Sequence, residues 1–305
     1  MKVRLIGAGA VGAPLALQLR DRCDLALIAE GERLGRLRKG IVINGKTELF
    51  EVEGPGEASA ADLLIIAVKN FSLEDALPLV DRFVGDSTVI LPLLNGIDAE
   101  DELCARYGEE KVLSAFMTDL SSSHEGDAVV CFRKGTVFLG ERSNVLSQRL
   151  SAITRLFDEA GVRWEIPLDM KRRKWWKLMV NSCFSTLSAV LSANYDGISR
   201  NGYLKRCARL VAREVVDVAN SEGVPLDQDD VESMIERFSL LTGKGKTSML
   251  EDTEQGLETE NEWLLGAVIR RAKKHGMKLP YSEFLYLLLE ARRKVTIEDR
   301  RIDDI

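Results

Sequence analysis

The first hydrophobic residues of the chain form a short run that leads into a glycine-rich stretch and then into a helical pattern. The run covers residues 3–6, and apolar residues recur at helical spacing up to Leu19. Between them lies the sequence Gly7-Ala8-Gly9-Ala10-Val11-Gly12. The pattern predicts a buried strand, a tight turn and a helix.

Glycines at these three positions allow a tight turn, a close approach to a pyrophosphate and packing of the helix on the strand. A lone GxGxxG motif is weak evidence, because glycine-rich turns are common. Here a strand precedes it, a helix follows, and an acidic residue, Glu30, lies about 20 residues further on. We therefore expect a dinucleotide to be bound by Gly7, Ala8, Gly9, Ala10, Val11, Gly12 and Glu30.

Apolar strands alternate with helices up to about residue 167. Further strands are predicted at 25–29, 62–68, 89–91 and 111–115, and such near-continuous apolar runs are typical of a buried parallel sheet. Asn44-Gly45 predicts a hairpin. After a serine-rich loop at 121–123, Lys134-Gly135 separates two segments that we expect to form a final antiparallel pair, 128–133 and 136–139.

From residue 169 onward the pattern is helical, with no convincing strand. We therefore predict an α/β fold in which a Rossmann-type dinucleotide-binding domain, residues 1–167, precedes an all-α domain, residues 168–305. The helical domain would serve substrate binding or dimerisation. The sequence does not fix the oligomeric state, and a homodimer remains open.

Composition excludes several classes of function. The net charge of −6 gives no basic face for a nucleic acid. The longest apolar runs fall far short of the roughly 20 residues that span a bilayer. The five cysteines have no CxxC spacing, so we expect buried free thiols, no metal site and a reducing, cytoplasmic location.

A polar line runs along the helix predicted at 171–190. Lys177, Asn181, Ser185 and Ser188 step by four, four and three residues and so share one face. The rest of the helix is largely apolar, which places a lysine on a face that should be enclosed, and lysine is rarely buried. Two interpretations remain open: a functional lysine, or one that reaches solvent or pairs with a core carboxylate.

A second candidate segment begins with a loop that Gly243 and Gly245 should make mobile. Residues 247–252 follow, and Glu260 is expected further along a helix that runs to about Lys274, on the same face as Asp252 and Gly256. The sequence alone does not decide the role of Glu260. The two histidines, in a polar loop and at a helix end, offer no catalytic pattern, so a buried lysine with a lowered pKa is the available acid for protonating an alkoxide.

Over nearly its whole length the chain resembles the ketopantoate reductases (2-dehydropantoate 2-reductases) of pantothenate synthesis. The resemblance lies in the glycine turn and, in order, in residues 68–69, 94–96, 176–181, 247–250 and 259–260. It implies reduction of 2-dehydropantoate to pantoate by NAD(P)H. The implied fold is a Rossmann domain followed by a helical domain like that of 6-phosphogluconate dehydrogenase, with the site in the cleft between them.

The resemblance also implies residue roles. Lys177 would be the general acid, and Glu260 would bind the nicotinamide ribose and orient the reacting group. Asn95 would lie where nicotinamide and substrate meet. Asn181 and Ser248 would bind the substrate's carboxylate and hydroxyl ends. Two further positions depart from the family pattern. Ser185 stands where the family commonly has a second asparagine, and Asn194 matches a later asparagine of the family only with a shift of one residue.

The cofactor preference is where residues and resemblance disagree. The family usually binds NADPH through an arginine at the end of the second strand, together with the lysine that is Lys69 here. This chain has Glu30 at the arginine's place, and an acidic residue there suits the ribose hydroxyls of NADH and repels a 2′-phosphate. Arg33 could still reach a phosphate, but we expect NADH to be preferred.

Two alternatives remain open. The protein could reduce another branched 2-oxo acid, which Ser185 would permit, or it could be a dinucleotide-sensing protein without catalysis. Retention of Lys177, Asn181 and Glu260 argues against the sensor.

Overall fold

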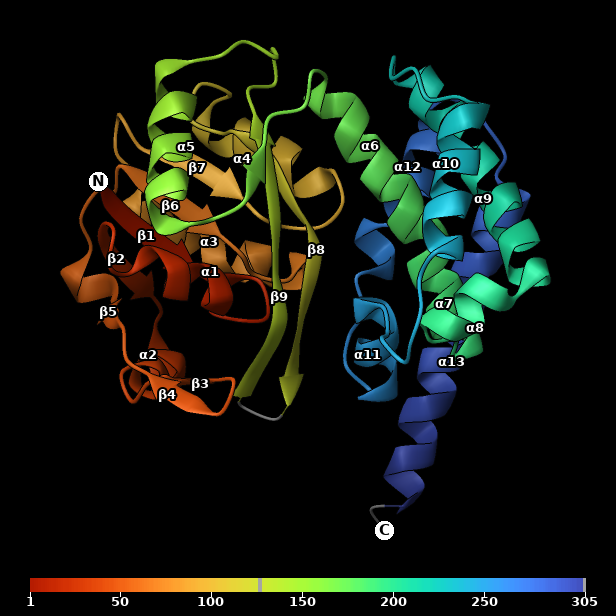
Figure 1. The fold of residues 1–305 in the computed structure, drawn as a ribbon, viewed down its shortest axis with the longest axis horizontal. Helices are drawn as coiled ribbons and strands as arrows, with labels where there is room; N and C mark the ends of the chain where they lie inside the picture. Colours follow the sequence, from red (N-terminus) through yellow and green to blue (C-terminus); the bar gives the residue numbers. More distant parts are fainter. Residues whose placement is uncertain (126–127, 304–305) are drawn as a thin grey trace. The chain divides into compact units, whose positions relative to one another are not determined.

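The computed structural model describes residues 1–125 and 128–303 of the chain, with side chains placed for 1–123 and 128–295. The chain divides into two compact units, Met1–Lys171 and Arg172–Ile305. The first contains strands and helices, whereas the described part of the second contains helices alone (Figure 1). The predicted fold class, an α/β Rossmann-type part followed by an all-α part, is confirmed.

A parallel five-stranded sheet forms the centre of the first unit. Its strand order is β5-β2-β1-β6-β7, and every neighbouring pair is parallel. The strands are β1 (Lys2–Ile6), β2 (Asp24–Ile28), β5 (Glu51–Glu53), β6 (Leu63–Ile66) and β7 (Val89–Pro92). This order makes β1 the central strand, so that the glycine turn follows the strand at the middle of the sheet.

Successive residues of these strands enter two different cores, one on each face of the sheet. Leu5 belongs to one core and Ile6 to the other, and Leu63 and Leu64 divide in the same way. Burial on both faces explains why the strands are apolar at nearly every position. The helices of this unit are α1 (Gly12–Leu19), α2 (Gly31–Leu37), α3 (Leu73–Val80), α4 (Asp98–Tyr107) and α5 (Gln148–Ala160).

A second sheet lies in the same unit, in the order β10-β9-β3-β4, with β8 paired to β9. The predicted hairpin at Asn44-Gly45 is confirmed, because it joins two short antiparallel strands of this sheet. The strands are β3 (Ile41–Ile43), β4 (Lys46–Glu48), β8 (Ser114–Glu125), β9 (Ala128–Gly140) and β10 (Trp164–Glu165).

The predicted reversal at Lys134-Gly135 is wrong, and so is the serine-rich loop at 121–123. Strand β9 runs straight through Gly135 and pairs with β8, which contains the serines. Gly135 has φ +78°, and a Cβ there would lie 2.8 Å from the backbone oxygen of Thr118. Glycine is needed here for close approach between two strands and not for a turn.

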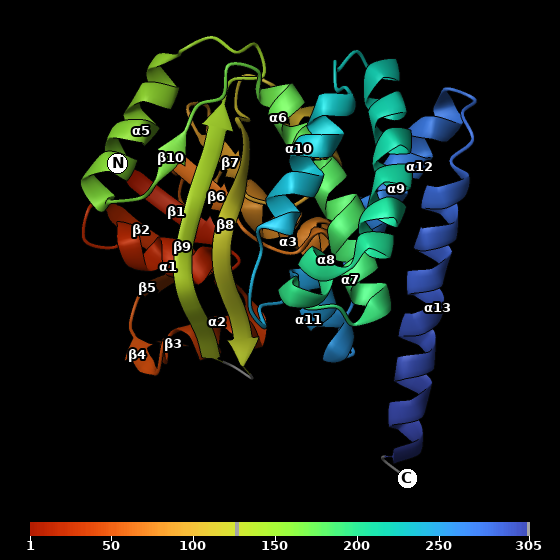
Figure 2. The ribbon, with the colours of Figure 1, turned by 45° about the vertical axis from the view of Figure 1, so that its right-hand side comes forward.

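The second unit is a bundle of helices. Its first helix, α6 (Met170–Val180), passes through one π-helical turn, Asn181–Ser185, into α7 (Thr186–Leu191). The helices that follow are α8 (Tyr195–Arg200), α9 (Gly202–Ser221), α10 (Gln228–Ser239), α11 (Ser248–Glu254), α12 (Leu265–Lys274) and α13 (Pro280–Asp303). The long C-terminal helix α13 packs against α7, α9 and α12 (Figure 2).

Candidate active site

The glycine turn follows β1 and ends at the first residue of α1. Gly7 has φ +96°, and a Cβ on it would lie 2.4 Å from the carbonyl carbon of Ala67. A Cβ on Gly12 would lie 2.1 Å from the backbone oxygen of Gly7. Both positions therefore require glycine, and residues 8–11 between them form turns that lead into the helix. The backbone amides at this helix N-terminus are suited to hold a pyrophosphate.

Two further loops lie at the carboxyl edge of the same sheet, after β6 and after β7. Lys69 and Asn70 follow β6, and Asn95 follows β7. The Asn70 side chain is buried, and its Nδ2 donates a hydrogen bond to the backbone oxygen of Asn95 at 3.0 Å. Because β1, β6 and β7 are adjacent and parallel, the glycine turn, Lys69 and Asn95 all lie at one edge, as open α/β sheets place their ligands.

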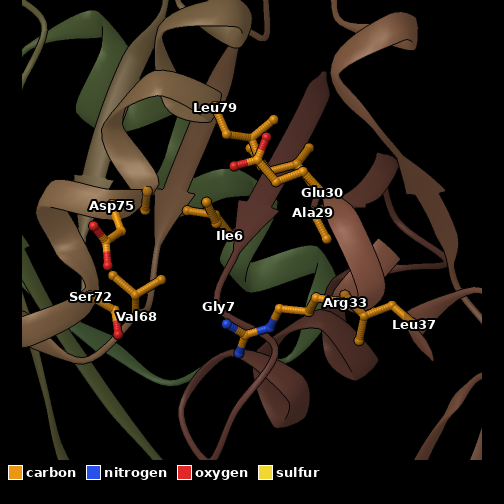
Figure 3. Close-up of a pocket in the computed structure, with 12 residues that line it drawn as sticks. Ile6, Gly7, Ala29, Glu30, Arg33, Leu37, Val68, Ser72, Asp75 and Leu79 are labelled. Atoms are coloured by element: carbon orange, nitrogen blue, oxygen red, sulfur yellow. The ribbon is translucent and has the colours of Figure 1, made fainter. Parts of the chain in front are cut away.

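A cavity of about 230 Å³ opens beside the glycine turn (Figure 3). Gly7, Glu30 and Arg33 line one part of it, and Ser72 and Asp75 of the segment after β6 line another. In Figure 3 the Arg33 side chain extends toward Gly7, whereas the Glu30 carboxylate points toward Leu79. The cavity thus has two carboxylates and one guanidinium on its walls.

In the second unit, Lys177 occupies the last turn of α6. Its side chain is partly buried, and burial lowers the pKa of Lys177 to about 8, with a smaller lowering from Lys174 that Glu260 opposes. An ordinary lysine has a pKa near 10.4. A pKa of about 8 leaves a large fraction protonated at neutral pH while making the ammonium a better proton donor.

Glu260 is buried, with 5% of its surface exposed. The prediction that it lies on a continuous helix is wrong. Helix α11 ends at Glu254, Gly256 has φ +67°, and Glu260 directly precedes a short 3₁₀ turn, Asn261–Trp263. Its backbone oxygen accepts hydrogen bonds from the amides of Trp263 and Leu264, at 3.1 and 3.0 Å. A turn and not a helical face therefore places this carboxylate near Lys177.

The polar line predicted on one helix is interrupted by the π turn. Asn181 is the first residue of that turn and Ser185 the last, and both are partly exposed, like Lys177. Ser188 is fully buried, and its Oγ donates to the backbone oxygen of Ala193 at 2.7 Å. Lys177, Asn181 and Ser185 are thus partly exposed, whereas Ser188 belongs to the interior.

The loop before α11 is not free, contrary to the expectation that Gly243 and Gly245 make it mobile. The amides of Tyr195 and Asp196 donate to the backbone oxygens of Gly245 and Gly243, at 2.9 and 3.1 Å. A Cβ on Gly245 would lie 2.6 Å from the Tyr195 ring. The glycines therefore serve tight docking against α8.

This docking brings two predicted substrate residues into neighbouring elements. Ser248 is exposed at the first position of α11, and Asn194 caps α8, where its Oδ1 accepts from the amide of Gly197 at 2.9 Å. Helix α11 also contacts the π turn and α7. Ser248 and Asn194 therefore lie in elements that are tied to each other, and α11 is tied to the turn that carries Asn181 and Ser185.

Two supporting residues were missed by the sequence analysis. Asn70 joins the loops after β6 and β7, and its position directly behind a buried strand was the available signal. Thr247 is buried and accepts from the amide of Leu250, while its Oγ1 donates to the Ser188 Oγ at 3.1 Å. Nothing in the sequence distinguishes this threonine from the exposed serine that follows it.

Among the described residues, no group of three acidic, histidine or cysteine side chains is placed to bind a metal ion. No helix in the described part of the chain is long and apolar enough to cross a membrane. All five cysteines are free thiols, but only Cys183 is buried, and Cys207 is exposed on α9. The expectation that all five are buried is wrong.

A glycine turn at the carboxyl end of the central strand of a parallel sheet, followed by a helical unit with a partly buried lysine and a buried carboxylate, defines a Rossmann-type oxidoreductase. Family models agree with this assignment. The model described as ketopantoate reductase PanE/ApbA matches residues 3–144, and that of its C-terminal part matches residues 169–293. The chain belongs to the ketopantoate reductase family.

Individual relatives span nearly the whole chain. The 2-dehydropantoate 2-reductase of Archaeoglobus fulgidus is 28% identical over 290 residues, covering 94% of this chain and 96% of that protein. The crystal structure of the 2-dehydropantoate 2-reductase from Geobacter metallireducens is 26% identical, with a TM-score of 0.85 and coverage of 95% and 99%. A ternary structure of D-mandelate dehydrogenase with NADH and anilino(oxo)acetate is 25% identical, with a TM-score of 0.86 and coverage of 97% and 99%.

Proposed function

We propose that this protein reduces 2-dehydropantoate to pantoate with a nicotinamide cofactor. The observation that supports this most is Lys177, a partly buried lysine whose pKa is lowered to about 8 beside the buried Glu260. Hydride reduction of a ketone needs an acid that protonates the developing alkoxide, and an ammonium group with this pKa suits that task. Membership of the ketopantoate reductase family points to the same reaction.

The first unit is suited to the dinucleotide. Side chains at Gly7 and Gly12 would collide with backbone atoms, and the loops that carry Lys69 and Asn95 lie at the same sheet edge. When bound, the nicotinamide would supply the hydride. Residues 7–12 would hold the pyrophosphate, and Asn95 would contact the nicotinamide and the substrate.

The helical unit would supply acid and substrate contacts. The Lys177 ammonium would donate its proton to the oxygen at C2 of the substrate as that oxygen becomes a hydroxyl. Glu260 would orient this oxygen and bind the nicotinamide ribose. Asn181, Ser185, Asn194 and Ser248 are the proposed contacts for the substrate's carboxylate and hydroxyl ends.

A second candidate substrate is another branched or bulky 2-oxo acid. Ser185 stands where the family commonly has an asparagine, and a smaller side chain at this position leaves more room. The likeness to a D-mandelate dehydrogenase, which was solved with an oxoacetate compound, favours including aromatic 2-oxo acids. A non-catalytic dinucleotide sensor is less well supported, because it would not need a partly buried lysine with a lowered pKa.

The test is to mix the purified protein with NADH or NADPH and a panel of 2-oxo acids and to follow the loss of nicotinamide absorbance. The proposal requires that kcat/KM be highest for 2-dehydropantoate. A higher value for another 2-oxo acid would assign that acid as the substrate. No turnover with any acid would favour the sensor.

For the cofactor we propose a preference for NADH. Glu30 and Asp75 both line the cavity beside the glycine turn, so a 2′-phosphate there would meet like charge from two sides. Arg33 extends toward Gly7 in the same cavity (Figure 3). Arg33 and Lys69 are both positively charged and would instead favour NADPH.

The roles of the two domains, the cellular location and the oligomeric state are further parts of the proposal. Residues 1–167 would be the cofactor domain and residues 168–305 the substrate domain, in a cytoplasmic protein. A homodimer is supported by α13, on which Phe284, Leu287, Leu288 and Val295 are exposed. Light scattering of the wild type and of Leu287→Arg tests this, with a monomer expected only for the variant.

A further inference from the structure

The turn that carries Glu260 is held on helix α13 by the two residues that follow the glutamate, Asn261 and Glu262. Asn261 is fully buried, and its Nδ2 donates to the Glu290 Oε1 at 2.9 Å and to the backbone oxygen of Tyr286 at 3.4 Å. The Tyr286 hydroxyl in turn donates to the Glu262 Oε2 at 2.6 Å. Tyr286 and Glu290 are four residues apart and so share one face of α13.

The two glutamates in this contact, Glu290 and Glu262, are each held by an arginine. The Arg293 guanidinium donates to the Glu290 Oε2 at 2.9 Å, and Arg270 of α12 donates to the backbone oxygen of Glu262 at 3.1 Å and pairs with its carboxylate. A buried amide that loses its acceptor destabilises the fold, because its polar group is then neither hydrogen-bonded nor hydrated. The turn therefore has one strongly preferred place on α13.

We propose that Asn261 and Glu290 are positioning residues that set the location of the Glu260 carboxylate relative to Lys177. Glu260 has no helix to support it, because α11 ends six residues earlier at Glu254. Its place is set by the turn, and the side chain that anchors the turn is the next residue in the chain. This inference rests on the proposed function only for its effect on catalysis.

The charged groups that act on Lys177 are Glu260, from the turn, and Lys174, one turn earlier in α6. Glu260 raises the pKa of Lys177, whereas burial and Lys174 lower it. If the turn loses its anchor and Glu260 moves away, only the two lowering effects remain. The pKa of Lys177 should then fall.

The test compares Glu290→Ala, Asn261→Ala and Glu290→Gln with the wild type by NMR titration of the lysine side-chain amines, with Lys177→Arg to assign the signal. Glutamine lacks the charge but keeps an oxygen that can accept from Asn261. We expect the Lys177 midpoint to move to lower pH in both alanine variants and to stay near the wild-type value in Glu290→Gln. Glu283→Ala, an exposed position on the same helix, is the matched control and should change nothing.

A folded Glu290→Ala protein with the wild-type midpoint would overturn the inference. So would an equal shift in Glu290→Gln, because the charge and not the hydrogen bond would then be responsible. If Asn261→Ala does not fold, Glu290→Ala decides alone. Parallel assays of kcat against pH keep the two proposals apart: shifted midpoints in a protein without turnover would reject the proposed function and retain the positioning role.

Discussion

Burial lowers the pKa of Lys177 to about 8, with a smaller lowering from Lys174, and the carboxylate of Glu260 is the one charge that opposes both effects. Lys177 lies at the end of α6 and Glu260 on a turn far along the sequence. The protonated lysine is the proposed proton donor. The activity should therefore be high below this pKa and decline as the pH rises through it.

Glu260→Gln removes the one effect that raises the pKa of Lys177. The pKa should fall below about 8, and the basic limb of the kcat profile should move to lower pH. We also expect kcat at the optimum to fall, because the reacting group is no longer oriented. Glu258→Gln is the control, since Glu258 is exposed two residues away. An unchanged basic limb in Glu260→Gln would separate Glu260 from the acid.

Asn70→Ala should weaken catalysis through Asn95. The variant loses the hydrogen bond to the Asn95 backbone oxygen, so the loop after β7 should lose its fixed place at the sheet edge. We expect a lower kcat/KM and a stability loss of about 1 kcal/mol, the usual contribution of one hydrogen bond.

Asn44→Ala is the control for that variant. The Asn44 side chain makes two hydrogen bonds to the backbone of Cys131, at 3.0 and 2.7 Å, in the second sheet. The Asn44→Ala variant should therefore be less stable than the wild type but keep the wild-type kcat/KM. Equal kinetic losses in both variants would assign the Asn70 effect to general destabilisation.

Ser248→Ala should raise the KM for the 2-oxo acid with little change in kcat, because a hydroxyl that binds the substrate carboxylate contributes equally in the ground and transition states. Ser248 is exposed, so Tm should not change. Thr247→Ala should lower Tm and leave KM unchanged, since Thr247 caps α11. Ser248 has no role in binding if its removal leaves KM unaltered.

The cofactor preference depends on Glu30. Glu30→Arg should shift the ratio of kcat/KM for NADPH over NADH upward, because a guanidinium replaces like charge beside the 2′-phosphate. Glu32→Arg is the matched control, since Glu32 is exposed and does not line the cavity. A wild type that strongly prefers NADPH would contradict the proposal.

The nucleotide half could be predicted from the sequence because its signals are local. The glycine turn, the apolar strands and the Asn44-Gly45 hairpin each depend on neighbouring residues. Gly135 was misinterpreted because a glycine can serve a turn or a close approach, and only the strand opposite, at Thr118, decides between them.

The helical half could be predicted only in part, because some of its structure depends on contacts between residues far apart in the sequence. Lys177 was found because a charge on an apolar helix is visible in the sequence. The turn at Glu260 was missed because its shape depends on contacts with α13 that are about 25 to 29 residues away. Helical periodicity continues across Gly256 in the sequence, but the φ of +67° at that residue ends it in the structure.

The central claim is that Lys177 donates the proton. Its most direct test is kcat for Lys177→Ala with 2-dehydropantoate at saturating cofactor, beside Lys171→Ala, an exposed lysine near the start of the same helix. We expect kcat to fall by about 10²–10⁴-fold for Lys177→Ala alone, the usual contribution of a general acid, with the Kd of the dinucleotide nearly unchanged. A Lys177→Ala protein that keeps near-full turnover would contradict the account.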